Sequence, residues 1–340
     1  MFNGWSWNRA WWTHYGHLGT LHVLVAVAGG VVRGIAPFYH TRSRLLRVVS
    51  LPTLRLLGRG GDTSPDDLDL LAEPGWGERV APLVVTHLLD VSGCARLELT
   101  DLPEDSGFGA ALLGEAARRG HVAPAVRTQS RPVGALPASV AAWRSGVTRN
   151  ARKQLRRRHN RLADAGHATF SLCATPAEVE AAHAALVRLH RARRASLGEE
   201  GGFRSERYVA FHAELMQALL ARDELRLGVL ALDGQPIAVE YAFAARGTLA
   251  FFQSGFDPAH ATLAPAHLLM HWMIESSIEA GVGRIDLLKG DYDYKRAYAT
   301  DTRTTRSIDL CTHAPLARVI ALARRTKAAL QRLRTRASSV

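Results

Sequence analysis

Residues 225–244 read LRLGVLALDGQPIAVEYAFA, and this stretch predicts a β-hairpin. Two apolar runs of strand length, residues 225–232 and 235–244, flank the dipeptide Asp233-Gly234. Asp-Gly between apolar runs is among the strongest short hairpin signals, because both residues tolerate the positive φ angles of a tight turn. We therefore expect two antiparallel strands joined by a two-residue turn.

A second stretch of the same kind lies near the N-terminus. Residues 21–28 form an apolar run, Gly29-Gly30 follows, and residues 31–39 return. The words VAVAGG and GIA in this stretch correspond to VLALDG and PIA in the other. A repeat separated by about 200 residues is too long for a solenoid, whose period is about 20–50 residues. The repeat therefore favours two similar domains in tandem.

Strands and helices alternate through the rest of the chain, which is typical of α/β or α+β domains. The segment 131–137 contains two prolines and a glycine and indicates a boundary, so we predict domains at 1–135 and 136–312. Residues 313–340 form a third part, a basic amphipathic helix. The expected helices lie at 5–15, 108–120, 138–165, 175–196, 205–221 and 265–280, and further strands lie at 47–51, 96–100, 170–173, 248–256 and 284–288.

The composition is that of a globular protein with a real core. The chain has 340 residues, of which 47% are hydrophobic and 22% are charged. No apolar run reaches the roughly 18 residues needed to cross a bilayer, and the N-terminal tryptophans do not form a secretory signal. Three widely spaced cysteines indicate neither a disulfide framework nor a metal knuckle. We expect a reducing compartment and a cytoplasmic location.

The net charge of +12 is concentrated in two segments. Residues 144–161 hold eight cations and no acid, and residues 318–336 hold seven cations and no acid. Such segments can serve nucleic acid or an acidic carrier, and a basic amphipathic helix also suits an anionic membrane surface. We interpret both as solvated helix faces, which is the ordinary role of a charge run.

Two of the few lysines lie in one short segment. Only four of the 43 Lys and Arg residues are lysines, and Lys289 and Lys295 both fall within residues 286–298, DLLKGDYDYKRAY. Arginine stays charged in proteins, whereas burial readily shifts the pKa of a lysine. The segment therefore indicates a specific ammonium group among aspartates and tyrosines.

Several short sequence motifs in the second half of the chain indicate one family. They are, in order, RKQLRR at 152–157, LHRARR at 189–194, DGQPIA at 233–238, GFDP at 255–258, APAHLL at 264–269 and a closing Gly290-x-x-x-Tyr294-Lys295. With these words, residues 138–300 resemble the GNAT-like acyltransferase domain of the CelD/BcsL type, related to the Fem peptidoglycan-bridge transferases.

The resemblance implies a fold and an activity. The fold is two tandem GNAT-like domains, each a mixed, mostly antiparallel sheet flanked by helices. The activity is transfer of an acyl group from acyl-CoA to an amine or hydroxyl acceptor, without a metal. Cell-envelope polysaccharide or secondary-metabolite biosynthesis is the expected setting.

The resemblance also implies a place for the acyl donor, acetyl-CoA or another acyl-CoA. In GNAT proteins the helix that begins here at Pro265 presents backbone N–H groups to the CoA pyrophosphate, and helix N-termini favour anions in general. The chain reads Ala-Pro-Ala where the family usually reads Ser-Pro-Gly, which narrows the room for a close approach. The residues assigned to the donor are Phe256, Ala264, Ala266, His267 and Leu268.

Two carboxylates are candidates for the base that deprotonates the acceptor. Glu240 lies on an otherwise apolar strand, where burial would raise its pKa. Asp286 ends a strand that reads as buried, a position where α/β folds place functional residues. The alternatives are an ordinary strand residue for Glu240 and, for Asp286, an ion pair or a partner of Lys289 or Lys295.

Tyr294 and Lys295 match the Tyr-Lys ending of the family. The resemblance implies that Lys295 binds a substrate anion or stabilises the tetrahedral oxyanion, and that Tyr294 protonates the departing thiolate; a loop anchor is the alternative. Arg194 matches a recurrent arginine that would clamp an anionic acceptor, with an ordinary exposed arginine as the alternative. Lys289 and Asp291 are also assigned to the substrate.

A metal site and two other functions complete the interpretation. His267, His271 and Glu275 share a helix face at a spacing that can bind zinc, but no further ligand is visible and we interpret them as packing or donor contacts.

A Fem-like transferase would take aminoacyl-tRNA, which gives the basic segments a role. A non-catalytic scaffold in polysaccharide export is the third hypothesis.

Overall fold

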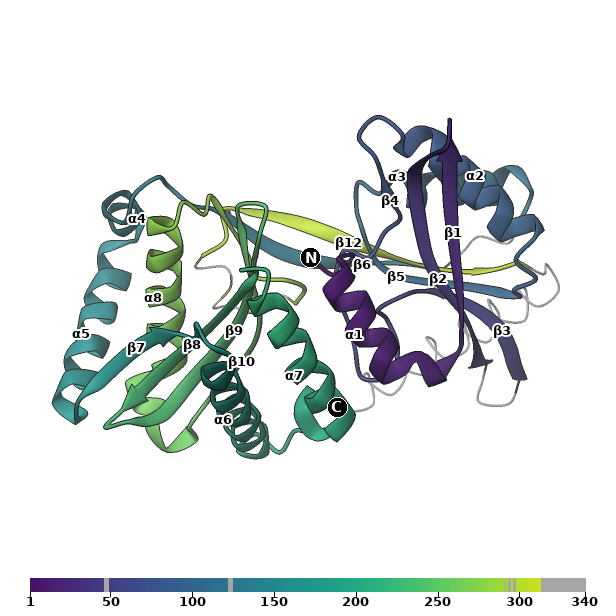
Figure 1. The fold of residues 1–340 in the computed structure, drawn as a ribbon. Helices are drawn as coiled ribbons and strands as arrows, with labels where there is room; N and C mark the ends of the chain where they lie inside the picture. Colours follow the sequence, from purple (N-terminus) through teal and green to yellow (C-terminus); the bar gives the residue numbers. More distant parts are fainter. Residues whose placement is uncertain (46–48, 122–124, 291, 293–294, 296–297, 313–340) are drawn as a thin grey trace, which may run out of the picture. The chain divides into compact units, whose positions relative to one another are not determined.

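The computed structural model describes residues 1–45, 49–121, 125–290, 292, 295 and 298–312 (Figure 1). Contacts divide the chain into two compact units. Unit 1 comprises Met1, Asn3–His14 and Ser130–Arg303, and unit 2 comprises Phe2, Tyr15–Gln129 and the chain from Thr304 onward. The predicted division into 1–135, 136–312 and 313–340 stays a prediction, and the expected helix in 313–340 lies outside the described residues.

The sheet of unit 1 has the strand order β6-β11-β10-β9-β8-β7. β10 and β11 are parallel, and the other neighbouring strands are antiparallel. β8 and β9 form the predicted hairpin, in which Asp233 and Gly234 both have the positive φ of a tight turn. The bounds are β6 (Ala125–Ala135), which begins in unit 2, β7 (Ala168–Leu172), β8 (Leu225–Leu232), β9 (Gln235–Ala245), β10 (Thr248–Phe256) and β11 (Arg284–Asp286).

Helices cover both faces of this sheet (Figure 1). α6 and α7 pack on one face, whereas α8 packs on the other and is itself contacted by α4 and α5. The core under α8 is aliphatic, with Leu268, Leu269 and Met273 buried against Leu249 and Ile285. The bounds are α1 (Trp5–Tyr15), α4 (Val140–Gly146), α5 (Arg149–Ala165), α6 (Pro176–Ala195), η2 (Gly202–Arg204), α7 (Glu206–Leu220), η3 (Pro258–Leu263) and α8 (Pro265–Glu279).

The prediction of one helix over residues 138–165 is wrong, because the structure has two helices there. α4 ends at Gly146, and Val147 takes an extended conformation. Thr148 then starts α5, and its side chain accepts a hydrogen bond from the N–H of Ala151. A glycine, a β-branched residue and an N-cap threonine in succession outweigh the helical periodicity.

The sheet of unit 2 has the order β1-β2-β3-β5-β12, with β4 paired to β2. β3 and β5 are parallel, and the other pairs are antiparallel. The bounds are η1 (Gly16–Leu18), β1 (Thr20–Ala28), β2 (Val31–Leu45), β3 (Val49–Leu56), β4 (Leu71–Ala72), α2 (Gly77–Asp90), β5 (Arg96–Pro103), α3 (Gly107–Arg118) and β12 (Asp301–Cys311), whose first residues belong to unit 1.

The two units follow the same path. In each, a hairpin and a third antiparallel strand lead into a helix that crosses to a parallel strand: β8-β9-β10-α8-β11 in unit 1 and β1-β2-β3-α2-β5 in unit 2. The predicted fold class, a mixed and mostly antiparallel sheet flanked by helices, is confirmed. Within the described residues, no helix is both long and apolar enough to cross a membrane.

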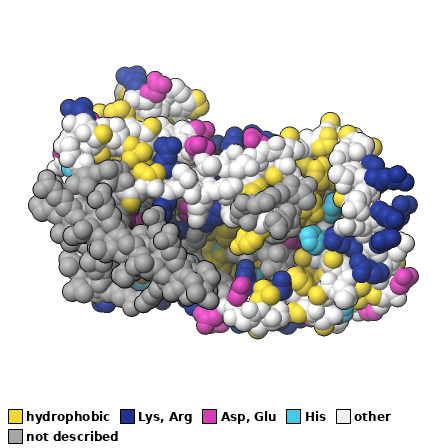
Figure 2. Space-filling model, turned by 180° about the vertical axis from the view of Figure 1, so that it is seen from behind, with side chains coloured by type: hydrophobic (Ala, Val, Ile, Leu, Met, Phe, Trp, Pro, Cys, Tyr) yellow, Lys and Arg dark blue, Asp and Glu magenta, His cyan; other side chains and the backbone are white. Residues whose placement is uncertain are grey.

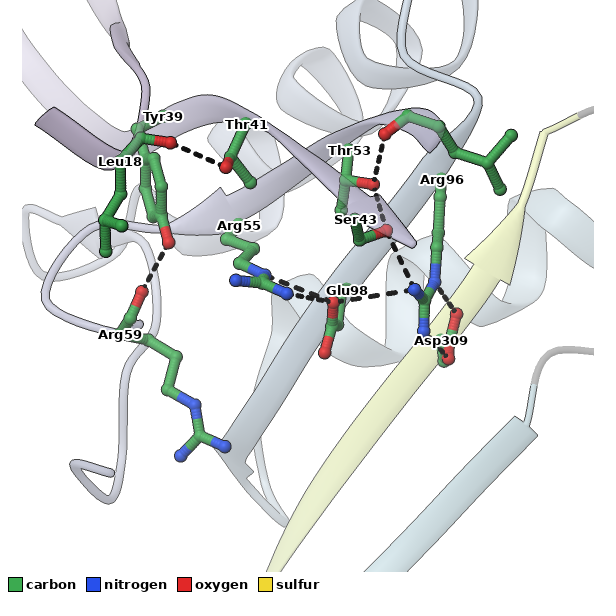
Figure 3. Close-up of polar contacts among 11 residues, drawn as sticks. Leu18, Tyr39, Thr41, Ser43, Thr53, Arg55, Arg59, Arg96, Glu98 and Asp309 are labelled. Carbon is green, nitrogen blue, oxygen red and sulfur yellow. Dashed lines mark hydrogen bonds and ion pairs between the residues drawn. The ribbon is translucent and has the colours of Figure 1, made fainter. Parts of the chain in front are cut away.

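A polar network joins four strands of unit 2 (Figure 3). Arg96 of β5 donates to both carboxylate oxygens of Asp309 on β12, at 2.8 and 2.6 Å, and to the hydroxyl of Ser43 on β2 at 2.9 Å. Arg55 of β3 pairs with Glu98 of β5 at 2.8 Å. These side-chain bonds join neighbouring strands, and the bond from Arg96 to Ser43 also reaches across β3 to β2.

Candidate active site

β10 and β11 end on the same side of the unit 1 sheet, at the C-terminal ends of its parallel strands; this side is called the edge below. The strands are parallel and adjacent and α8 connects them, so the N-terminus of α8 lies at the edge where β10 ends. Their pairing covers only residues 248–250 of β10, which continues to Phe256 beside β9. An edge where parallel strands end beside a helix N-terminus is a common ligand site in sheets of this kind.

Glu240 of β9 reaches this edge because it lies opposite Ser254, near the end of β10. Its other neighbour across the sheet is Gly228 of β8, where an added Cβ would collide with Met273 of α8. Residues opposite each other point to the same face, so Glu240 faces α8. Alanines two residues before and after Glu240 leave room for its carboxyl group.

The carboxyl group of Glu240 is buried without a polar partner. The residue is 7% exposed, and in the described part of the chain it has neither a hydrogen-bond donor nor a cation. Loss of hydration raises its pKa well above the ordinary 4.5. Proteins seldom bury such a group without a use for it, and a raised pKa suits a base that works near neutral pH.

The first turn of α8 leaves one N–H group available. Ala264 is the N-cap, has a φ of 54° and makes no side-chain cap. Its carbonyl oxygen accepts the N–H groups of His267 and Leu268, and Pro265 has no N–H. Among the described residues, the N–H of Ala266 finds no acceptor. It lies at the positive end of the helix, where an anion is favoured.

The backbone at this edge is strained at two apolar residues. Ala264 has a φ of 54° and Leu288, just after β11, has a φ of 57°. This conformation costs a residue with a Cβ about 1–2 kcal/mol. The other non-glycine residues with positive φ in the described ranges are aspartates and one arginine. Strain of this kind collects at functional sites.

A basic helix lies next to the start of α8. α5 contacts both α8 and η3, and residues 149–161 hold seven cations and no acid. Figure 2 shows Lys and Arg side chains gathered along the edge of the molecule that α5 forms. Burial and, second, the charge of Arg158 lower the pKa of His267. The first turn of α8 itself contains no acid, so the surroundings favour a bound anion.

Asp286 forms an ion pair with an arginine that the sequence did not single out. Its carboxylate accepts hydrogen bonds from Nε and an Nη of Arg131 on β6, and both side chains are buried. It also accepts the N–H of Leu288 at 2.8 Å. Asp286 thus holds the strained Leu288 in place. The ion pair was one of the alternatives for Asp286, its partner is Arg131 and not a lysine, and a role of Asp286 as the base stays a prediction.

Lys295 is buried and supports the same turn. Its ammonium group donates to the carbonyl oxygens of Leu288 at 3.2 Å and Lys289 at 2.9 Å, and it lies 5.3 Å from the ring centre of Tyr292. These contacts are those of a loop anchor, the alternative interpretation of Lys295. A role toward substrate stays a prediction. Tyr294 and Asp291, assigned to catalysis and to substrate, lie outside the described residues.

Residues 149–296 match the acetyltransferase (GNAT) domain. The matched segment begins at α5 and ends beside Lys295, so it includes Glu240, α8 and β11. No curated protein matches the chain. The narrower CelD/BcsL type stays a prediction.

Solved structures resemble the chain over nearly its whole length. FemX has a TM-score of 0.61 at 10% identity, covering 94% of this chain and 94% of that chain. The C-terminal domain of a protein described as a lysylphosphatidylglycerol synthetase from Agrobacterium fabrum has 0.55 at 12%, covering 91% and 89%. L-PGS from Bacillus licheniformis has 0.53 at 13%, covering 95% and 96%. At these identities the likeness shows the fold, and it spans both units.

An arginine that the sequence did not single out, Arg193, lies beside the end of β10, and the substrate role of Arg194 stays a prediction. Arg194 is partly exposed and pairs with Glu199 at 2.6 Å. The guanidinium of Arg193 instead lies 5.0 Å from the ring centre of Phe256. Neighbouring helix positions point in directions about 100° apart, so a one-residue difference decides which side chain reaches the strand.

His190 is a second residue of the GNAT region that the sequence reasoning missed. Its Nδ1 lies 3.0 Å from the carbonyl oxygen of Ser254, the residue opposite Glu240. Burial lowers the pKa of His190, so the neutral ring donates this bond from Nδ1. His190 therefore fixes β10 at the level of Glu240.

The zinc spacing on α8 does not assemble a metal site among the described residues. Both carboxylate oxygens of Glu275 accept hydrogen bonds from Arg144 at 2.7 Å. Burial lowers the pKa of His271 to about 4, and its ring packs 5.2 Å from that of Tyr298. No group of three or more His, Cys, Asp or Glu in the described ranges is placed to hold a metal ion.

Proposed function

We propose that this chain transfers an acyl group from acyl-CoA to an amine or hydroxyl acceptor, with Glu240 as the general base. One observation carries the proposal: the buried carboxyl group of Glu240, which has no polar partner among the described residues, lies opposite the end of β10 near the start of α8, and burial raises its pKa. The GNAT match over residues 149–296 supports the same class of reaction.

Glu240 would take the proton as the acceptor attacks the thioester carbonyl. A C–N or C–O bond then forms, the C–S bond breaks, and the thiolate leaves with a proton that we assign to Tyr294. Backbone N–H groups of β10 beyond its pairing with β11 would stabilise the oxyanion. Removing the proton from a bound amine is within reach of a carboxylate whose pKa burial has raised.

The donor phosphates would bind at the start of α8. Ala266 offers its N–H, which has no acceptor among the described residues, and the cations of α5 add a positive field. Leu268 packs in the core and its N–H bonds within the helix, so its part would be to position the turn. Phe256 and Arg193 would flank the donor or the acceptor at the end of β10.

The Glu240→Gln variant tests the proposal. It keeps the shape of the side chain and removes the base, so kcat should fall by about 10²–10⁴. Acyl transfer would be measured with a panel of acyl-CoA donors and amine acceptors, and donor binding by thermal stabilisation. The variant should bind donor like the wild type. Glu78→Gln, in the first turn of α2, is the matched control and should keep full activity.

Two results would count against this proposal. Full acyl transfer by Glu240→Gln would remove Glu240 from the mechanism. Failure of every acyl-CoA to stabilise the wild type or to react would argue for another donor, or for the scaffold hypothesis.

An aminoacyl-tRNA donor is the second candidate, because α5 offers an unusual surface. Its seven cations form no ion pair in the part of the chain that the structure describes, and α5 adjoins the start of α8. RNA binding should then weaken steeply with salt. Arg156→Ala with Arg157→Ala should lower tRNA affinity and flatten the salt dependence. No binding of tRNA at low salt would exclude this donor.

A further inference from the structure

α6 contains four arginines, and Arg193 differs from the other three. Arg193 is half-buried, and it has neither a hydrogen bond nor an ion pair in the part of the chain that the structure describes. The other three donate to carbonyl or carboxylate oxygens, which are those of Pro236 for Arg188, of Phe203 and Glu206 for Arg191, and of Glu199 for Arg194. The guanidinium of Arg193 is therefore available to an anion that is not part of the described chain.

The ring of Phe256 supports this guanidinium without using its N–H groups. The central carbon of the guanidinium lies over the ring, 5.0 Å from its centre. An aromatic ring contacts the flat face of a guanidinium, whereas the N–H groups point outward in the plane and match the two oxygens of a carboxylate. One face of the guanidinium is therefore packed, and its N–H groups are left to bind a carboxylate or a phosphate.

α6 lies close to β10, which explains how one of its residues reaches Phe256. At Gly255, an added Cβ would lie 2.6 Å from the backbone nitrogen of His190. The Nδ1 of His190 also lies 3.0 Å from the carbonyl oxygen of Ser254. Arg193 follows His190 by three residues, so both lie on the same face of α6. The contacts of His190 with β10 thus fix Arg193 at the end of this strand.

Glu240 and Phe256 lie on the same face of the unit 1 sheet. Ser254 is opposite Glu240 and Phe256 is opposite Ala238, and the register between these pairs is regular. Residues two apart on a strand point to the same face, and Phe256 packs against the core cluster under α8. The base and the ring that supports Arg193 are therefore two residues apart along β10, which is about 7 Å.

The surface between these two groups is open to solvent at Ser254. Ser254 is exposed, although Gly255 and Glu240 beside it are buried. β11 pairs with β10 only over residues 248–250, so within the described residues the last part of β10 has a paired strand on the β9 side alone. An acceptor can therefore lie on Ser254, with its nucleophile at Glu240 and its other end toward Arg193.

We propose that Arg193 binds a carboxylate of the acceptor, so that the acceptor is a small amine with a carboxylate a few carbon atoms from its nitrogen. This inference rests on the proposed function, in which Glu240 takes the proton of the amine. When a hydrogen bond of about 3 Å is counted at each end, the span along β10 leaves room for only a few carbon atoms between the amine and the anion. The product is the N-acyl derivative, with its carboxylate unchanged.

A phosphate of the donor fits Arg193 less well than a carboxylate of the acceptor. The anion site proposed for the donor consists of the N–H of Ala266 and the cations of α5, and α5 and α8 pack together on one face of the sheet. Arg193 belongs to α6, which covers the opposite face and reaches only the end of β10. The donor phosphates thus have cations of their own, and Arg193 is left for the acceptor.

Acyl transfer to matched pairs of acceptors tests the proposal. The panel contains the proteinogenic amino acids, β-alanine and γ-aminobutyrate, each beside its carboxamide, which keeps the amine and loses the negative charge. With the wild type, kcat/KM for the best carboxylate acceptor should exceed that for its amide about 10–100-fold. Arg193→Ala should abolish this preference by raising KM while kcat stays nearly constant.

Two further variants separate binding from folding. Arg193→Lys should retain part of the preference, because lysine keeps the charge and loses the planar fork of N–H groups. Arg188→Ala, at an exposed position on the same helix, is the matched control and should keep the full preference.

Thermal stabilisation by each ligand alone separates the acceptor from the donor. Arg193→Ala should bind acyl-CoA like the wild type and should lose the stabilisation by carboxylate acceptors. If no acyl-CoA reacts, but carboxylate-bearing amines still stabilise the wild type and not Arg193→Ala, the proposed function fails and the assignment of Arg193 stands.

Three outcomes would overturn the assignment of Arg193. One is a wild type that acylates carboxylates and their amides equally well. Another is an Arg193→Ala protein that loses acyl-CoA binding and keeps the acceptor preference, which would assign Arg193 to the donor phosphates. The third is a panel in which no carboxylate-bearing amine is acylated or stabilises the wild type.

Discussion

The two crossover segments, β9-β10-α8-β11 in unit 1 and β2-β3-α2-β5 in unit 2, share a path but differ in the side chains at corresponding places. Glu240 lies opposite Ser254 in unit 1, and the matching hairpin of unit 2 has Phe38 opposite Leu56. Phe38 is fully buried, and its ring packs 6.0 Å from that of Phe108. The same strand position is a carboxyl group in one unit and part of the core in the other.

The two crossover helices also begin differently. The first turn of α2 contains Glu78, whereas the first turn of α8 contains no acid. Trp76, which precedes α2, has Arg33 and Arg79 over its ring at 4.8 and 4.3 Å. The positive N-terminus of α2 therefore has a carboxylate of its own chain, whereas the N-terminus of α8 has none and can bind an external anion. A shared topology therefore offers a site, and a few side chains decide whether it is used.

Phe38→Ala should give the largest change in stability. Removing a buried ring leaves a cavity and lowers the free energy of unfolding by about 3–5 kcal/mol. Glu240→Gln should raise the free energy of unfolding slightly, because a neutral amide is less costly to bury than a carboxylate. Urea unfolding of both variants measures the contrast. Equal destabilisation by the two variants would contradict the assignment of Glu240 to a site.

Asp286→Asn should destabilise unit 1 by about 3–5 kcal/mol, because it breaks a buried pair with Arg131. It should also lower acyl transfer, since Asp286 holds Leu288. The matched variant in unit 2 is Asp309→Asn, which breaks the pair with Arg96. It should cost less, because water reaches that pair more easily, and should leave the rate per folded molecule unchanged. An active and stable Asp286→Asn protein would exclude a positioning role.

Acid should destabilise unit 1 through its buried histidines. Burial lowers the pKa of His183, His190 and His212 below the ordinary 6.5, furthest for His212. Stability is complete above pH 6.5, where both states are neutral, and falls below it because the unfolded chain takes up protons first. Each histidine contributes up to about 1.4 kcal/mol per pH unit.

His212→Phe isolates one of these contributions. The ring of His212 lies among aromatic side chains, 4.3 Å from Tyr208, so phenylalanine suits the site. Urea unfolding between pH 6.5 and 5 should show a shallower loss of stability by about 1.4 kcal/mol per pH unit. Leu83→Phe, at an exposed position on α2, is the control and should keep the wild-type slope. A slope for His212→Phe equal to that of the wild type would refute the prediction.

Ala266→Glu should give the smallest effect and tests the helix comparison directly. The variant places a carboxylate in the first turn of α8, where α2 already has Glu78. An anionic donor should then bind about tenfold more weakly, which is a loss of about 1.4 kcal/mol in binding free energy. The helix itself should gain about 0.3–1 kcal/mol, because an acid favours its positive end. Isothermal titration with acyl-CoA measures the affinity. Unchanged affinity would place the phosphates elsewhere, and Glu78→Ala serves as the control.

Local signals predicted much of the fold. The Asp-Gly and Gly-Gly hairpins were recognised because their turns need particular residues, and Thr175 and Pro265 marked true helix starts. β6 and β12 were missed because their pairing partners are distant in sequence, as in the bond between Arg96 and Asp309 across 213 residues. Pro132 of β6 and Pro137 just after it also made the end of this strand read as a boundary.

The candidate site was predicted in part for the same reason. Glu240 was recognisable as a carboxylate in an apolar strand, and the structure describes it as buried. Arg131 was not recognisable, because it meets Asp286 across 155 residues. The strand predicted over 284–288 ends at Asp286, since Leu288 turns to positive φ. Pairing at a distance and backbone strain leave little trace in local sequence.

The pH dependence of kcat/KM for acyl transfer tests the central claim most directly. If Glu240 is the base, the rate should rise with pH through an apparent pKa well above the ordinary 4.5 of a glutamate. Glu240→Gln should lose this rising limb together with about 10²–10⁴ of the rate. A Glu240→Gln protein that keeps both the wild-type rate and the wild-type pH profile would contradict the account.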